Sequence, residues 1–184
     1  MRTILVVAVL TFLSTIGSSR AGAQTSPAFE LPLLITSAGQ SADVTMAGML
    51  CKKIGVQAKT LPNAKGSDLA GVKTLMIVPG FSSKGLGAAG TSRDQELERV
   101  KGLISAARDK KVKILVLHLG GNARRGPQSD DFNRMAAEAS GRMIIVKQGD
   151  EDGFFSAIAK EKSIPIDIVD KIASAATPLS ALFK

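Results

Sequence analysis

Apolar runs alternate along this chain with amphipathic stretches, and this alternation restricts the fold more than any other feature of the sequence. It is typical of a β-α-β fold, in which helices connect parallel strands. Within these runs, apolar and polar residues do not alternate. This is expected for strands that helices cover on both faces. We therefore predict an α/β fold: a three-layer, doubly wound, mostly parallel sheet of five or six strands, Rossmann-like or flavodoxin-like.

The same pattern predicts where the elements lie. The expected strands are residues 31–36, 56–60, 72–78, 112–117, 142–146 and an edge strand at 164–168. The expected helices are residues 42–54, 92–109, one capped by Ser129, 154–160, and a helical tail over 169–183 that Pro178 divides. Long glycine-rich loops are expected at residues 79–91, 120–128 and 149–153.

The N-terminus has the pattern of a secretory signal. A basic residue, Arg2, precedes an apolar run over residues 4–13, and Ala21-Gly22-Ala23 fits the small-residue cleavage rule. The run is about half the roughly 20 residues that a membrane span requires. We predict a signal peptide over residues 1–23, cleaved after Ala23, and a single α/β domain over residues 24–184 that is periplasmic or secreted. An uncleaved membrane anchor is the alternative.

Charge and cysteine content narrow the class of partner. The formal charge is +8, and removal of residues 1–23 takes away Arg2 and Arg20 but no acidic residue. A basic chain suits an anionic partner. Nucleic acid is disfavoured because the chain has no Trp or Tyr for base stacking and is expected to be exported. The single cysteine, Cys51, excludes an internal disulfide, and its helical spacing predicts a buried thiol.

Polar and glycine-rich segments follow the predicted strands, where ligands bind in open parallel sheets. Serine and glutamine lead into a helix N-terminus, which favours anions; a second segment combines hydroxyls with an ammonium; a third holds two adjacent guanidinium groups. The predicted ligand-binding residues are Gln40, Ser41, Ser82, Ser83, Lys84, Gly85, Arg124 and Arg125. The structural alternatives are that Ser41 only caps a helix, that residues 82–85 form a mobile loop, and that an arginine pairs with Asp130 or Asp131.

A G-x-G-x-x-G motif spans residues 85–90, but its context is wrong for a dinucleotide site. That fingerprint needs a strand directly before it and a helix that opens within it. Here several residues separate the motif from the predicted strand 72–78, and the expected helix begins only after it. We therefore expect no cofactor, and interpret the segment as a lid or a loop around a ligand.

His118, the only histidine, lies at a predicted strand end and suggests a second class of function. Ser82 or Ser83 could act as nucleophile, with His118 as base and Asp150 or Asp152 orienting it. No G-x-S-x-G elbow supports this interpretation. A metal site from the same histidine and aspartates is a further alternative, but the acidic loop lacks the calcium-loop pattern, so no metal is predicted.

Three segments together are similar to an uncharacterised family of exported bacterial proteins, known as a domain of unknown function. They are residues 36–41, residues 82–90, and residues 120–126 with Ser129 and Asp130. The resemblance covers most of the chain after residue 23. It implies a signal peptide and a Rossmann-like or flavodoxin-like sheet, and it implies no activity.

The leading hypothesis from these observations is an exported, single-domain binding protein for a small anionic ligand, such as a carboxylate. It would serve a membrane transporter or sensor. A serine/histidine-dependent hydrolase or transferase and a non-catalytic interaction subunit of a membrane system are the alternatives. Flavin binding is disfavoured because no Trp or Tyr is present to stack on the ring.

Overall fold

The structure is a computed structural model that describes residues 28–183. These residues form one six-stranded sheet in the order β2-β1-β3-β4-β5-β6, and every neighbouring pair is parallel. The predicted signal peptide and its cleavage after Ala23 lie outside the described residues. No helix within residues 28–183 combines the length and the apolar character needed to cross a membrane.

The elements follow the alternation expected from the sequence. The strands are β1 (Leu33–Ala38), β2 (Ala58–Thr60), β3 (Thr74–Pro79), β4 (Lys113–His118), β5 (Arg142–Val146) and β6 (Ile166–Val169). The α-helices are α1 (Asp43–Lys53), α2 (Ser83–Ala88), α3 (Arg93–Asp109), α4 (Asp130–Ala139), α5 (Phe154–Lys162) and α6 (Ala176–Leu182). Short 3₁₀ helices are η1 (Gly66–Leu69), η2 (Gly121–Arg124), η3 (Lys147–Gly149) and η4 (Ile172–Ala175).

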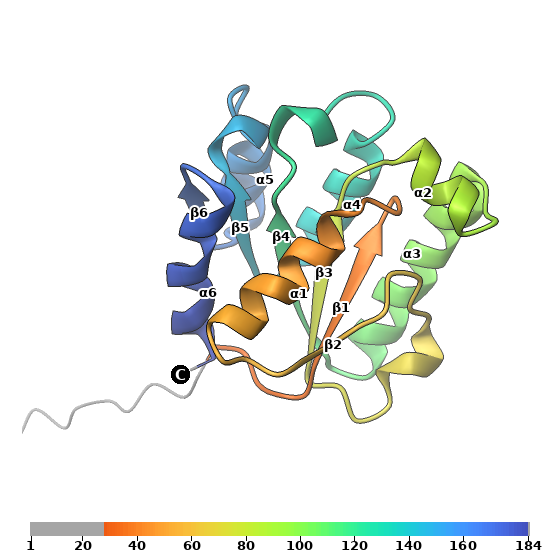
Figure 1. Ribbon diagram of the computed structural model, residues 1–184, viewed down its shortest axis with the longest axis horizontal. Helices are drawn as coiled ribbons and strands as arrows, with labels where there is room; N and C mark the ends of the chain where they lie inside the picture. Colours follow the sequence, from red (N-terminus) through yellow and green to blue (C-terminus); the bar gives the residue numbers. More distant parts are fainter. Residues whose placement is uncertain (1–27, 184) are drawn as a thin grey trace, which may run out of the picture.

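Helices cover both faces of the sheet, as Figure 1 shows, with α1 and α6 in front of it. Alternate residues of each strand point to opposite faces. In β1, Leu34 packs in the core beneath α3, α4 and α5, whereas Leu33 and Ile35 pack beneath α1 and α6. This two-sided burial explains the continuous apolar runs and confirms the predicted three-layer α/β fold.

The strand order is that of flavodoxin-like doubly wound folds, extended by a sixth strand. The chain passes from β1 outward to β2 and then returns to β3, beyond which each new strand is added on the other side. The topological switch point therefore lies between β1 and β3. Ligands of such sheets bind outside the carboxyl ends of the strands at this point.

Several boundaries differ from the prediction. The segment over residues 79–91, predicted as a loop, contains α2, because Ser82 caps a helix whose Leu86 is buried. β1 begins only after Pro32, so it is shifted two residues from the expected range. Pro178 lies in the first turn of α6, where a missing N–H costs no helical hydrogen bond, and does not divide a helix.

Two predictions concerned single residues: a buried thiol at Cys51 and a helix cap at Ser129. Cys51 is fully buried on α1, and burial raises the pKa of its thiol to about 11, as expected for an inert core cysteine. Ser129 precedes α4, but its side chain does not cap that helix. Its Oγ instead accepts a hydrogen bond from the backbone N–H of Phe81, 3.1 Å away, which ties α4 to the segment after β3.

Candidate functional site

Arg124 links three of the segments that follow the strands. Its Nε donates to Asp43 Oδ2 in the first turn of α1 at 3.2 Å, and its Nη1 donates to the Phe81 carbonyl at 3.2 Å. Its aliphatic stem lies against Gly80 and Gly120, where an added Cβ would come within 2.9 Å and 2.0 Å of Arg124 carbons. These two glycines are therefore needed for packing, and the guanidinium already has an acidic partner.

The crevice at the switch point is closed by the protein's own backbone. Gln40 and Phe81 form an antiparallel bridge, and Ser82 N–H donates to the Gly39 carbonyl at 2.8 Å. A Cβ at Gly39, which has φ +100°, would lie 2.6 Å from the Gly80 carbonyl oxygen. The segments after β1 and β3 thus pack together where related sheets hold a ligand.

Gln40 and Ser41, two of the predicted ligand-binding residues, are buried and hydrogen-bonded within the protein. The Gln40 Nε2 donates to Glu96 Oε1 at 3.1 Å, and the same oxygen accepts from Gly39 N–H at 2.9 Å. The Ser41 Oγ accepts from Asp43 N–H at 3.2 Å, but the N-cap of α1 is Ala42 and no side chain caps this helix, so Ser41 does not have the capping role considered as the alternative. Both residues therefore organise the loop after β1.

Glu96 and Arg99 form a buried ion pair on α3 that the sequence analysis did not identify. Arg99 Nε lies 2.7 Å from Glu96 Oε2, and Arg99 also donates to the carbonyls of Ala64 and Ser37 at 2.6 Å. Glu96 is only 1 % exposed. One signal was present in the sequence: Glu96 lies four residues before Val100, on the buried stripe of the helix.

The predicted segment 82–85 forms the N-terminal part of α2. Two of its residues make contacts within the protein and two face solvent. Ser82 Oγ accepts from Gly85 N–H at 3.0 Å and so caps the helix. A Cβ at Gly85 would lie 1.9 Å from the Gln40 carbonyl oxygen, so glycine is required there. Ser83 and Lys84 are exposed, and within residues 28–183 Lys84 forms no ion pair.

Arg125 points away from Arg124 into a separate cluster. It bonds Asp130 at 2.8 Å and Asp152 at 2.9 Å, and its guanidinium lies 4.2 Å from the centre of the Phe154 ring. The hydrogen bond from Arg125 lowers the pKa of Asp152 to about 2, and the two carboxylates raise the pKa of Arg125. Two acids thus neutralise this arginine, which was the structural alternative with Asp130 as partner.

His118 is fully buried, and the structure brings no serine hydroxyl into hydrogen-bond contact with it. Its Nε2 lies 3.3 Å from the Arg124 carbonyl, and its ring packs on Phe155. Burial lowers the pKa of His118 to about 4, so the ring is neutral at pH 7. Its Nδ1 has no partner among the described residues and faces Gly149.

The two candidate orienting aspartates are also engaged elsewhere. Asp150 accepts from the N–H groups of Phe155 at 2.6 Å and Ser156 at 3.1 Å, which satisfies the first turn of α5, and Asp152 pairs with Arg125. The structure therefore does not bring a serine, His118 and an aspartate together as the hydrolase alternative requires. Within the part of the chain that is described, no cluster of histidine, cysteine or acidic residues could hold a metal ion.

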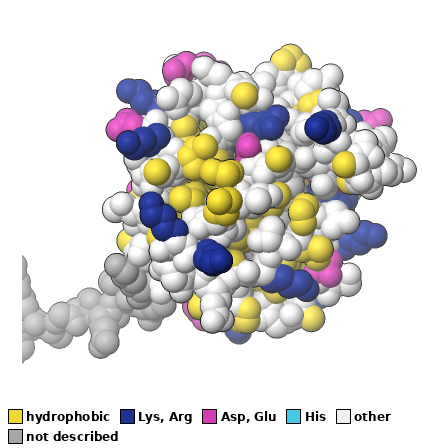
Figure 2. Space-filling model, in the orientation of Figure 1, with side chains coloured by type: hydrophobic (Ala, Val, Ile, Leu, Met, Phe, Trp, Pro, Cys, Tyr) yellow, Lys and Arg dark blue, Asp and Glu magenta, His cyan; other side chains and the backbone are white. Residues whose placement is uncertain are grey.

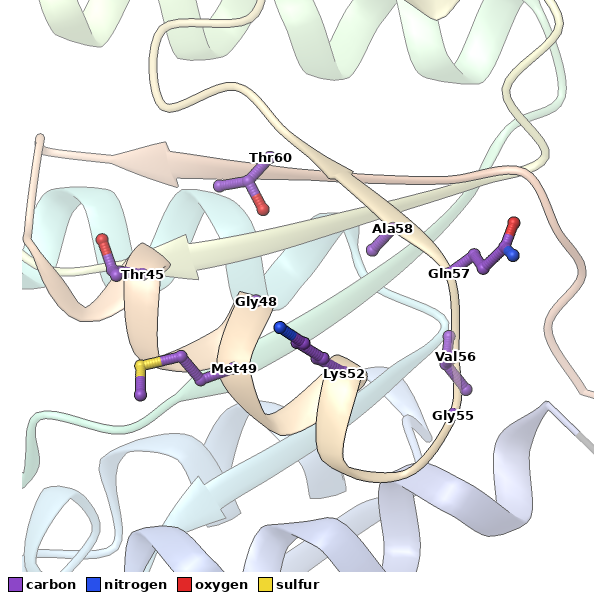
Figure 3. Close-up of a pocket in the computed structure, with 9 residues that line it drawn as sticks. All are labelled: Thr45, Gly48, Met49, Lys52, Gly55, Val56, Gln57, Ala58 and Thr60. Carbon is purple, nitrogen blue, oxygen red and sulfur yellow. The ribbon is translucent and has the colours of Figure 1, made fainter.

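A ligand-sized cavity lies elsewhere, in a groove between α1 and the edge strand β2 (Figure 3). We call it the α1/β2 groove; its volume is about 710 Å³. It is lined by Thr45, Gly48, Met49, Lys52, Gly55, Val56, Gln57, Ala58 and Thr60. Lys52 is the only charged residue among them.

The groove depends on the close approach of α1 to β2. A Cβ at Gly48 would lie 3.0 Å from Thr60 Oγ1, so the missing side chain leaves the space open. Met46 and Met49 project from α1 at 39 % and 59 % exposure, off the helix stripe that packs on the sheet. Figure 2 shows hydrophobic side chains gathered on this face between α1 and the C-terminal elements, with Lys and Arg side chains around them. The two exposed methionines, three residues apart on one helix, were the signal in the sequence for this face of the molecule.

The solved structures with some similarity in fold include hydrolases, but the likeness is low. A GDSL-like lipase from Bacteroides thetaiotaomicron is 11 % identical, with 77 % of this chain and 68 % of that chain covered and a TM-score of 0.36. A putative acylhydrolase from Bacteroides fragilis is 10 % identical, with 74 % and 65 % covered and a TM-score of 0.33. The SGNH-hydrolase family esterase AlinE4 is 9 % identical, with 73 % and 72 % covered and a TM-score of 0.30.

Values this low assign no activity to the chain. No curated protein matches it. A family model, in contrast, matches residues 30–183, nearly all of the described structure, and its description is a domain of unknown function, DUF6305. This match confirms the resemblance to an uncharacterised family. The chain belongs to the DUF6305 family.

Proposed function

We propose that this protein is a non-catalytic binding protein for a small organic anion, and that the ligand occupies the α1/β2 groove. The observation that carries the proposal is a cavity of about 710 Å³ whose only charged lining residue is Lys52. Ligand cavities have volumes of about 300–1,000 Å³, with mostly apolar walls and a few polar groups that orient the ligand.

The chemistry of the walls suits an amphipathic carboxylate. Met49, Val56 and Ala58 supply apolar surface for the body of the ligand, and each methylene that it buries contributes about 0.8 kcal/mol. The Lys52 ammonium is a flexible point charge that can pair with a carboxylate. The hydroxyl of Thr60 can donate a further hydrogen bond to the ligand.

The groove is a better candidate than the two predicted arginines because its cation is available. Arg124 is paired with Asp43, and Arg125 with two aspartates. Binding of an anion by either arginine would require displacement of a carboxylate that is already in place. Lys52 forms no ion pair with any residue from 28 to 183.

The export pattern of residues 1–23 supports a location outside the cytoplasm. In that setting a protein of this kind would capture its ligand and deliver it to a membrane transporter or sensor. This role is part of the same proposal and depends on the groove being occupied. The proposal includes no cofactor and no nucleic acid.

The test is a titration of the protein with straight-chain carboxylates, read by thermal shift and calorimetry. Propionate, hexanoate and octanoate should bind with increasing affinity, and hexanamide should bind more weakly than hexanoate because it lacks the charge. A ligand at a hundred times its Kd stabilises the folded state by about 2.7 kcal/mol, which is easily measured. If octanoate leaves the melting temperature unchanged, the proposal is wrong.

The matched variants are Lys52→Met and Lys53→Met. Both lysines lie in the last turn of α1, where each complements the helix dipole, but only Lys52 lines the groove. We expect Lys52→Met to weaken octanoate binding by about fivefold or more, consistent with about 1 kcal/mol for a charge pair of this kind. Lys53→Met should leave it unchanged. Equal effects of the two variants would contradict the assignment of Lys52.

A further inference from the structure

A second cavity, of about 390 Å³, opens at the carboxyl ends of β4, β5 and β6. We call it the β4–β6 cavity. Its apolar lining comes from Leu119 and Val146, which are both buried, and from Ile172, which is partly buried. It lies at the edge of the sheet where α/β proteins bind ligands, but away from the closed switch point between β1 and β3. It shares no residue with the α1/β2 groove.

The polar residues that line this cavity carry one charge of each sign. Asp170 and Lys171 are adjacent in the chain and exposed, and across residues 28–183 neither forms an ion pair. Gln148 adds an amide, and Asn122 is held in place because its Nδ2 donates to Glu151 at 3.1 Å. An apolar surface thus adjoins one unpaired carboxylate and one unpaired ammonium.

Two glycines give the cavity its shape. Gly121 has φ +54°, and a Cβ there would lie 3.1 Å from the Gln148 Cβ, so a side chain would crowd the lining. At Gly120 a Cβ would lie 2.0 Å from Arg124 Cγ and 2.5 Å from Asp43 Oδ2. The ion pair of Arg124 and Asp43 therefore supports this wall of the cavity from behind.

We propose that the β4–β6 cavity binds a small zwitterion with an apolar side chain, of the class of the free apolar α-amino acids. The ligand carboxylate pairs with Lys171, its ammonium pairs with Asp170, and its side chain covers Leu119 and Val146. A single anion or cation would satisfy only one of the two adjacent charges, whereas a zwitterion satisfies both. This site is independent of the anion proposed for the α1/β2 groove.

The experiment is a calorimetric titration of the full-length chain with leucine, N-acetyl-leucine and leucine amide. N-acetyl-leucine lacks the ammonium, and leucine amide lacks the carboxylate. We expect leucine to bind at least threefold more tightly than either. Asp170→Asn should bring the affinities for leucine and N-acetyl-leucine close together, and Lys171→Met should do the same for leucine and leucine amide.

Lys147→Met is the matched control, because Lys147 is exposed on η3 close to Gln148 but does not line the cavity. It should leave all three affinities unchanged. Only a change of the affinity ratios in the Asp170 and Lys171 variants counts for the β4–β6 cavity, which separates it from the carboxylate site proposed at Lys52. Circular dichroism and melting temperature would establish that each variant is folded. The proposal is overturned if leucine does not bind, or if the ratios of the three affinities are the same in the Asp170 and Lys171 variants as in the original chain.

Discussion

At the scale of single residues, Glu96 connects segments that are far apart in the chain. Its carboxylate accepts from Gly39 and Gln40 after β1, and its partner Arg99 holds the carbonyls of Ser37 and Ala64. A charge this deeply buried is tolerated only with a close partner and further hydrogen bonds. The pair therefore positions the loop at the closed switch point, although it takes no part in either proposed site.

Glu96→Gln should destabilise the protein strongly. The substitution leaves the Arg99 guanidinium almost buried without its counter-charge, and breaking a buried pair in this way costs about 3–5 kcal/mol. Urea unfolding would measure the loss. Glu98→Gln is the control, since Glu98 forms an exposed pair with Lys101 on the same helix with the same spacing, and its removal should cost under about 1 kcal/mol. Similar losses in both variants would contradict the organising role of Glu96.

The residues of the predicted site could be recognised individually, but of the partners of the two arginines only Asp130 was anticipated. Arg124 and the glycines after β3 and β4 are in contact, as their positions after predicted strands suggested. The other acids that bind the arginines come from distant parts of the chain: Asp43 is 81 residues from Arg124, and Asp152 is 27 residues from Arg125. Pairing at such separations depends on tertiary structure, and local sequence patterns do not encode it.

At the scale of elements, regular helices and strands were predicted best where burial and capping agree. The Ser92 cap and the apolar stripe defined α3, and β5 has the predicted bounds. The helix α2 was missed because its glycines have low helix propensity. It forms because tertiary contacts compensate: Ser82 caps it and Leu86 is buried.

Two glycines in α2 offer a direct test of this explanation. Gly85→Ala should destabilise the protein by about 1–3 kcal/mol, because the new Cβ would lie 1.9 Å from the Gln40 carbonyl oxygen. Gly87→Ala should be stabilising by up to about 1 kcal/mol, because its Cβ would meet nothing within 4 Å and alanine favours the helix. Thermal unfolding of the two variants would compare them. Effects of the same sign would show that the contact of α2 with Gln40 is not what requires Gly85.

At the scale of the whole molecule, the doubly wound fold was predictable, whereas the place of the cavities was not. Apolar runs report burial on both faces of a strand, and that is enough to define the three layers. Open space depends on how α1 approaches β2 and on how η2, η3 and η4 are arranged, which are matters of packing. None of the eight predicted ligand-binding residues lines either cavity, although the β4–β6 cavity lies at the ends of strands.

Global stability should depend on pH through His118. Burial lowers the pKa of this ring to about 4 in the folded state, whereas it titrates near 6.5 when unfolded. Between these values the unfolded chain binds a proton that the folded protein does not bind. The free energy of unfolding should therefore fall by about 3 kcal/mol as the pH drops from about 6.5 to about 4.

Urea unfolding at several pH values would check this dependence, with His118→Gln as the comparison. Glutamine can still donate to the Arg124 carbonyl but does not titrate. The variant should lose most of the slope between pH 6.5 and 4, whatever its stability at pH 7. An unchanged slope would assign the pH dependence to other groups.

Both edge strands of the sheet are short, and this affects how readily one molecule of the protein associates with another. β2 has three residues and β6 has four, against six in β1, β3 and β4. An unpaired strand edge is a template for another chain, and short edges carrying charges limit that risk. Lys59 on β2 adds such a charge, whereas Asp167 on β6 is paired with Arg142 of β5 at 2.8 Å. Each edge of the sheet thus exposes few free backbone groups, and the fold itself acts as a safeguard against edge-to-edge aggregation.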